Sequence, residues 1–252
     1  AADESTGTMT KRLSSVSVES TLESRLRFRE TLFSADGMKN YIGGVILYDE
    51  TIKQKTSSGK TVPELIKNNG SIPGIKVDTG AKKLAGSPEE KITEGLDGLR
   101  ERLSDYYKLG ARFTKWRAVY NISNTYPSKL AIQSNAHTLA RYAALVQEAK
   151  MVPIVEPEVL MDGDHDINKC YEVTTEVLKE CYKELKLHKV NLKGTILKPN
   201  MILPGNKSKD KNSSKEIAKM TLKCLKENVP IEVPGIAFLS GGQTEIEATE
   251  NL

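Results

Sequence analysis

Residues 152–160, Val-Pro-Ile-Val-Glu-Pro-Glu-Val-Leu, decide the fold because this apolar run of strand length lies between two segments of helical period. In those segments, Ser128 to Lys150 and Asn168 to Lys186, apolar residues recur three and four positions apart. The next apolar run of strand character is Gly194 to Lys198. Strands that alternate with helices in this way predict parallel pairing with right-handed crossovers.

The same alternation continues in both directions along the chain. Four further runs of strand character are Gly43 to Tyr48, Gly74 to Asp78, Phe113 to Tyr120 and Gly235 to Leu239. All six runs begin roughly 30 to 40 residues apart, which is the length of one βα unit. No linker divides the chain. The sequence therefore predicts an α/β protein with a single TIM (β/α)8-barrel domain over residues 1–252.

The composition is that of a globular protein. Of 252 residues, 38% are apolar and 28% are charged, and 37 Lys+Arg against 33 Asp+Glu give a net charge of +4. These values argue against a disordered chain. No apolar run approaches the roughly 18 residues that a membrane-spanning helix requires. The mild, dispersed positive charge gives little support to nucleic-acid binding, whereas small phosphate esters fit it.

The cysteines and the chain ends bear on location. Cys170, Cys181 and Cys224 have neither metal-type spacing nor the density of a disulfide scaffold, so we expect a reducing, cytoplasmic location. The sequence opens at Ala1-Ala2-Asp3 without a starting Met or a targeting segment. We therefore expect that both ends of the natural protein are missing from this sequence.

Charged residues gather at the predicted carboxyl ends of the strands, where a parallel barrel carries its chemistry. Residues two apart in a strand share one face, and three such pairs precede a lysine at the end of a fourth strand. The residues are Lys76 with Asp78, Lys115 with Arg117, Glu156 with Glu158, and Lys198. A single charge at a strand end is usually a solvated rim residue. Four strands with the same pattern favour a site for an anionic substrate.

These residue types fit Schiff-base chemistry. A lysine that is partly desolvated and crowded by cations loses its proton more easily, and the neutral amine can attack a carbonyl. Lys198 or Lys115 could serve. A carboxylate must then move protons, and Glu156 and Glu158 are the candidates. Asp3, if it ends a first strand, would balance the charge of the group.

Two segments could bind phosphate, and one resembles a metal loop. Ser240-Gly241-Gly242 follows a strand and precedes a predicted helix at Glu245, although an ordinary turn is an equal alternative. Residues 4–12 combine hydroxyls, a glycine and two cations, or they form a capped helix start. The run 162–166, Asp-Gly-Asp-His-Asp, lacks the glycine and glutamate of a calcium loop, which favours a polar turn. His137 and His188 show no ligand spacing with His165, and we predict neither a metal nor a cofactor.

With these residues in place, the sequence resembles the class I fructose-bisphosphate aldolases, which are metal-independent Schiff-base lyases of glycolysis and gluconeogenesis. The resemblance runs through the whole chain. The matching stretches are Ala1 to Gly7, Ile42 to Leu47, Gly74 to Asp78, Lys115 to Arg117, Val155 to Glu158, Gly194 to Asn200 and Phe238 to Gln243.

The resemblance implies reversible cleavage of fructose 1,6-bisphosphate to dihydroxyacetone phosphate and glyceraldehyde 3-phosphate, with a role for each matching residue. Lys198 matches the Schiff-base lysine and Glu156 its acid/base. Asp3 matches the aspartate that takes the C4 hydroxyl proton, and Lys115 matches a lysine that assists around the carbinolamine. Positions that bind the two phosphates are matched by Ser5, Thr8, Lys11, Arg12, Lys76, Arg117 and Ser240 to Gly242. Thr8 stands where many relatives have Ser, which keeps the hydroxyl. The family continues beyond the position of Leu252 into an eighth strand and a C-terminal tail, so the resemblance implies that both are absent here and that the first strand is cut to its last residues.

The resemblance also implies a homotetramer and leaves a second class of function open. Members of the family bind actin and the acidic cytoplasmic tails of adhesins, and the net charge of +4 would permit such contacts. We therefore weigh a scaffold role against the lyase. A related Schiff-base lyase for another sugar phosphate is a third alternative. Preference between fructose 1,6-bisphosphate and fructose 1-phosphate is not fixed by the sequence.

Overall fold

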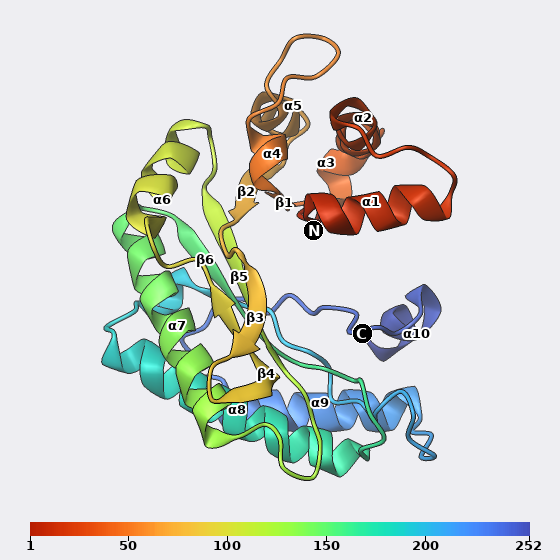
Figure 1. The fold of residues 1–252 in the computed structure, drawn as a ribbon, viewed down its shortest axis with the longest axis vertical. Helices are drawn as coiled ribbons and strands as arrows, with labels where there is room; N and C mark the ends of the chain where they lie inside the picture. The colour runs from red at the N-terminus through yellow and green to blue at the C-terminus, as the bar shows by residue number, and fades with distance from the viewer. The chain divides into compact units, whose positions relative to one another are not determined.

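The computed structural model describes residues 1–252 and divides them into two compact units. Unit 1 comprises residues 1–77, 98–115 and 149–151, and unit 2 comprises residues 78–97, 116–148 and 152–252. No helix has the length and apolar content needed to cross a membrane. Each unit contains parallel strands and helices, which confirms the predicted α/β class (Figure 1).

Unit 1 is built around strands β1 (Gly44–Leu47), β2 (Ile72–Lys76) and the first three residues of β5 (Phe113–Tyr120), paired in parallel in that order. Ala2 adds a single parallel bridge to Leu47. The helices of this unit are α1 (Thr6–Ser15), α2 (Leu22–Phe33), α3 (Met38–Tyr41), α4 (Asp49–Ile52), α5 (Val62–Asn68) and α6 (Leu99–Lys108).

The strand packing in unit 1 depends on a glycine. Gly74 in β2 lies against the ring of Phe113 in β5, and a Cβ added at Gly74 would come within 2.4 Å of that ring. A distance this short is far inside van der Waals contact, so only glycine allows the two strands to carry Phe113 here.

Unit 2 continues the parallel order from β5 through β6 (Val152–Val159) to β7 (Ile196–Leu197). It also contains the antiparallel hairpin of β3 (Gly80–Leu84) and β4 (Ser87–Glu94). Its helices are α7 (Lys129–Glu148), α8 (Ile167–Leu187), the 3₁₀ turn η1 (Leu192–Gly194), α9 (Ser214–Asn228) and α10 (Glu245–Asn251). Helix α8 packs between α7 and α9 (Figure 1).

The core of unit 2 forms where α7 covers the strands. Trp116 of β5 is fully buried, and its ring centroid lies 5.3 Å from that of Tyr142 on α7. Such a tilted pair of large rings contributes apolar burial and a favourable ring–ring contact. Trp116 lies between Lys115 and Arg117 in β5. Successive side chains of a strand point to opposite faces, so Trp116 packs under α7 and its two charged neighbours lie on the other face. The two long helices predicted from period, at residues 128–150 and 168–186, are confirmed.

Two predicted strands are shorter in the structure. In the segment 194–198 only Ile196 and Leu197 are a strand, because residues 192–194 turn as a 3₁₀ helix. In the segment 235–239 only Ile236 forms a bridge, to Leu197. Pro199 has no amide hydrogen to donate to a continued ladder, which accounts for the short pairing. The segment 74–78 also shifts: β2 begins at Ile72 and ends at Lys76.

Helix boundaries follow local capping chemistry. Ser213 precedes α9 and accepts a hydrogen bond from the Glu216 amide at 3.3 Å, while the Glu216 carboxylate accepts from the Ser213 amide at 2.8 Å. This reciprocal capping box satisfies two amide groups that the helix itself cannot pair. The predicted helix start at Ser213-Ser214 is therefore confirmed, as is the helix that begins at Glu245.

Candidate functional site

Lys198 and Glu156 form an ion pair at the carboxyl ends of neighbouring strands. The parallel register sets Val155 of β6 opposite Leu197 of β7, so the residues that follow each of them lie together. The Lys198 Nζ donates to the Glu156 Oε1 at 2.7 Å, and the side chains are only 16% and 3% exposed. One hydrogen bond thus joins a potential nucleophile to a group that can exchange its proton.

Arg117 forms a second ion pair in unit 2, with Glu158. The Arg117 Nε donates to the Glu158 Oε2, and Glu158 is buried. Burial lowers the pKa of Arg117, but the hydrogen bond and charge of Glu158, with the charges of Glu156 and Asp78, outweigh burial and raise it. The Arg117 side chain is still 42% exposed, so a fixed positive charge remains accessible to an anionic ligand.

Asp78 fixes the backbone beside this arginine. Its carboxylate accepts from the Gly80 amide at 3.1 Å and from the Arg117 amide at 3.4 Å. Asp78 is buried, so both of these contacts lie out of contact with solvent. The structure therefore gives Asp78 a supporting position next to the strand that carries Arg117.

The segment before Ser240 runs beside the strand end that carries Lys198. The Ala237 amide donates to the Leu197 carbonyl at 2.9 Å, and the Leu239 amide donates to the Pro199 carbonyl at 3.3 Å. Gly241 and Gly242 then adopt φ values of +63° and +89°, which non-glycine residues rarely adopt. Two successive glycines in this conformation turn the chain immediately before α10, so both sequence interpretations, a turn and a phosphate loop, fit the backbone.

In unit 1, Asp3 and Lys115 form a buried ion pair. The Lys115 Nζ lies 2.5 Å from the Asp3 Oδ2, and the side chains are 6% and 11% exposed. Strand β5 places Lys115 in register with Lys76 of β2, so two predicted cations lie on adjacent strands. Asp3, which was expected to join the charged strand-end residues if it ended a first strand, is thus paired with one of them, Lys115.

Arg29 supports Asp3 and was not found by sequence reasoning. Its guanidinium is 1% exposed and donates to the carbonyls of Ala2 at 3.1 Å and Glu4 at 2.7 Å. Burial lowers the pKa of Arg29, with partial compensation from the charge of Glu4. Arg29 thereby fixes the backbone on both sides of Asp3. One arginine in a helix gives no sequence signal for this role.

The remaining predicted phosphate ligands of unit 1 lie along α1, from its N-cap to its last turn. Ser5 occupies the N-cap position without capping the helix through its side chain, and its hydroxyl lies 3.3 Å from that of Thr8. Lys11 is exposed, and Arg12 pairs with Glu4 at 2.5 Å. A pair of hydroxyls and two cations on one short helix is a suitable surface for a phosphate group.

The run 162–166, for which a polar turn was predicted, ends at Asp166, and Asp166 caps helix α8. Its Oδ1 accepts from the Lys169 amide at 2.7 Å. His165 is buried beside it, and burial lowers the pKa of this imidazole despite the charges of Asp164 and Asp166. The three cysteines are free and buried.

Comparisons with known proteins agree with one another along the chain. The family model "Glycolytic: Fructose-bisphosphate aldolase class-I" matches residues 1–252. A "Probable fructose-bisphosphate aldolase class 1" of Xylella fastidiosa is 53% identical over all of this chain and 75% of the relative. "Fructose-bisphosphate aldolase 4, cytosolic" of Arabidopsis thaliana is 54% identical over all of this chain and 64% of the relative.

A solved structure gives the same result for the fold. It is the fructose-bisphosphate aldolase from Plasmodium falciparum, in complex with TRAP and a small-molecule inhibitor. The TM-score is 0.98 at 45% identity, over 99% of this chain and 73% of that chain. The structural match is therefore as extensive as the sequence match.

Proposed function

Because this chain belongs to the class I fructose-bisphosphate aldolase family, the barrel-fold lyases that cleave fructose 1,6-bisphosphate through a lysine Schiff base, we propose that Lys198 forms that Schiff base here. The observation that carries this assignment is the ion pair between Lys198 and Glu156.

The first half of the reaction follows from this pair. Lys198 must lose a proton before its nitrogen attacks the substrate carbonyl, and Glu156 lies within one hydrogen bond to receive it. The carbinolamine then loses water, for which a protonated Glu156 can supply the proton to the departing oxygen. The same two atoms thus serve in both directions of the reversible reaction.

Carbon–carbon cleavage needs a base for the C4 hydroxyl and an acceptor for the electron pair. The protonated imine accepts the electrons of the C3–C4 bond and becomes an enamine. We assign the removal of the hydroxyl proton to Asp3 and assistance around the carbinolamine to Lys115. Their buried ion pair supports both assignments, because it places the carboxylate and the ammonium group in direct contact.

The phosphate groups carry about four negative charges between them. We assign their binding to Ser5, Thr8, Lys11, Arg12, Lys76, Arg117 and the loop 240–242. The exposed part of Arg117 and the hydroxyl pair of α1 support these assignments. Glu158 and Asp78 would act by holding the strand of Arg117 in place. Competition by inorganic phosphate and by salt is expected.

Borohydride trapping tests the nucleophile. The protein is incubated with fructose 1,6-bisphosphate, reduced, and mapped by peptide mass spectrometry. We expect the adduct on Lys198, its loss in Lys198→Arg, and its retention in Lys193→Arg, a matched change at an exposed lysine of η1. An adduct on Lys115 with none on Lys198 would overturn the assignment.

A partner-binding role is a second proposal, favoured by the solved relative in complex with TRAP. We propose actin or an acidic adhesin tail as the partner, a homotetramer as the assembly, and the cytoplasm as the location, which agrees with the cytosolic names of plant relatives. If the partner uses the phosphate-binding cations, fructose 1,6-bisphosphate displaces it in a pull-down. Undiminished binding at saturating substrate places the partner elsewhere.

A further inference from the structure

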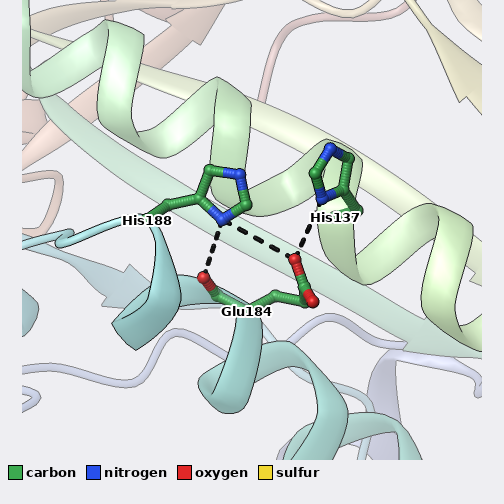
Figure 2. Close-up of side chains that lie close together, drawn as sticks. All are labelled: His137, Glu184 and His188. Atoms are coloured by element: carbon green, nitrogen blue, oxygen red, sulfur yellow. Dashed lines mark hydrogen bonds and ion pairs between the residues drawn. The ribbon is translucent and has the colours of Figure 1, made fainter.

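Two histidines and a glutamate form a cluster on the helices of unit 2, apart from the residues assigned above. His137 comes from α7, and Glu184 and His188 come from the last turns of α8 (Figure 2). Residues four apart on a helix lie on the same face, so α8 presents Glu184 and His188 together. Helices α7 and α8 pack along each other, and this contact brings His137 to the pair.

The separations between the three groups approach those of a metal site. The Glu184 Oε2 lies 3.0 Å from His137 Nδ1 and 3.6 Å from His188 Nδ1. Ligand atoms at about 2.1 Å from a tetrahedral zinc ion are roughly 3.4 Å apart. One ligand atom from each residue lies within 4.8 Å of the other two. Closing the widest separation therefore requires side-chain movements of about an ångström.

The surroundings favour a cation. The Glu184 and His188 side chains are 13% and 22% exposed, whereas His137 is 52% exposed and leaves the cluster open to solvent. His188 is the C-cap of α8, where the helix dipole places partial negative charge. The neighbouring carboxylate of Glu180 is already paired with Lys183 at 2.9 Å. Glu184 is thus the carboxylate that contacts both imidazoles.

We propose that His137, Glu184 and His188 bind a divalent transition-metal ion, best matched by Zn²⁺, with water completing the coordination. Two imidazoles and one carboxylate suit zinc, whereas calcium and magnesium prefer sets of oxygen ligands. The site ties α7 to α8 and takes no part in the Schiff-base reaction. It extends beyond the proposed function and does not depend on it.

Titration of the protein with Zn²⁺ in a calorimeter, and with Co²⁺ by visible absorption, tests the site. We expect one equivalent to bind, with a Co²⁺ spectrum of a nitrogen and oxygen site that lacks thiolate charge-transfer bands. Glu184→Gln and His137→Ala should each weaken zinc binding by about 100-fold or more. Removing a residue that only hydrogen-bonds to a metal ligand already costs about 10–100-fold, and loss of a ligand itself should cost at least as much. Zinc should also raise the thermal unfolding midpoint of the parent protein.

The matched control is Glu180→Gln, one turn earlier on the same helix, which removes the same charge and leaves the three ligands in place. It should bind zinc like the parent. Circular dichroism shows whether each variant is folded. If Glu184→Gln does not fold, zinc binding by His137→Ala is the deciding measurement, because His137 is more than half exposed and its replacement should not disturb the fold. The proposal fails if the parent binds no zinc, or if His137→Ala binds it with parental affinity.

Discussion

Each unit of the molecule contains one buried pair of a lysine and a carboxylate, and the two pairs differ in how a ligand could reach the lysine. In unit 2, Lys198 is 16% exposed and follows a strand of two residues. In unit 1, Lys115 is 6% exposed and is the third residue of a strand of eight. Both pairs join one ammonium group to one carboxylate and are largely buried, but the lysine of unit 2 is the more exposed. Access at a strand end therefore separates the proposed nucleophile from the lysine that supports it.

The largest effect should come from exchanging the lysines for arginine, which keeps the charge but cannot form a Schiff base. We expect Lys198→Arg to lower kcat for fructose 1,6-bisphosphate by at least about 10⁵-fold, the scale on which removal of a covalent nucleophile acts. Steady-state kinetics of both variants measure the contrast. Lys115→Arg should lower kcat less than Lys198→Arg does. A larger loss of kcat in Lys115→Arg would contradict the proposed difference between the two lysines.

The two glutamates of β6 provide the next test. Glu156→Gln removes the group that exchanges a proton with Lys198, so we expect kcat to fall by about 10²–10⁴-fold. Glu158→Gln on the same strand leaves the Lys198 pair intact and loosens Arg117, so its main effect should be a higher KM. Measuring kcat and KM separately distinguishes the roles. Equal losses of kcat in both variants would contradict them.

The buried ion pair of unit 1 should make a measurable contribution to the free energy of unfolding. Lys115→Met leaves the Asp3 carboxylate buried without its ammonium partner, and we expect the free energy of unfolding to fall by about 3–5 kcal/mol. The control is Lys108→Met, whose partner Asp105 and own side chain are 72% and 73% exposed, with an expected change of about 0–1 kcal/mol. Urea denaturation of both variants measures the difference. Equal midpoints would show that the Asp3 pair contributes no more than a surface contact.

The sequence predicts those parts of the molecule that local pattern determines. The 20-residue helix α7 and strand β5 were predicted nearly to their ends because their apolar periods are long and regular. The hairpin of β3 and β4 was missed because its first strand, Gly80–Leu84, is mostly exposed and carries adjacent lysines in place of alternating apolar residues. Tertiary pairing creates this hairpin, in which Asn135 of α7 contacts the Thr93 amide.

The same limit applies to the candidate site. Spacing along the strands predicted that Glu156, Lys198, Lys115 and Arg117 lie late in their strands, whereas the structure has Lys115 as the third residue of β5. Spacing could not predict which acid pairs with which cation, because pairing depends on the register between strands. Resemblance to a family selected Lys198 over Lys115, and the 2.7 Å contact to Glu156 gives that choice a physical basis. The approach of His137 to Glu184 depends on helix packing, although the spacing of Glu184 and His188 was a usable signal.

The smallest expected effect concerns a lysine–carboxylate pair that water reaches, Lys53 with Asp49. Their atoms are 2.7 Å apart, but the side chains are 56% and 46% exposed. Burial raises the pKa of Asp49, while hydrogen bonds from Lys53 and Tyr106 and the charges of Lys53 and Arg102 outweigh it and lower the pKa. A carboxyl group with a lowered folded-state pKa stabilises the protein fully above its unfolded pKa of about 3.9, and this contribution disappears as the pH falls through the folded value.

We therefore expect Lys53→Met to change the free energy of unfolding at pH 7 by less than about 1 kcal/mol. Asp49→Asn should reduce the loss of stability below about pH 4. Denaturation at a series of pH values, with the Asp49 carboxyl followed by NMR, measures both effects. A loss in Lys53→Met as large as that in Lys115→Met would mean that exposure does not set the strength of these pairs, and the contrast between the buried and the solvated lysines would have to be abandoned.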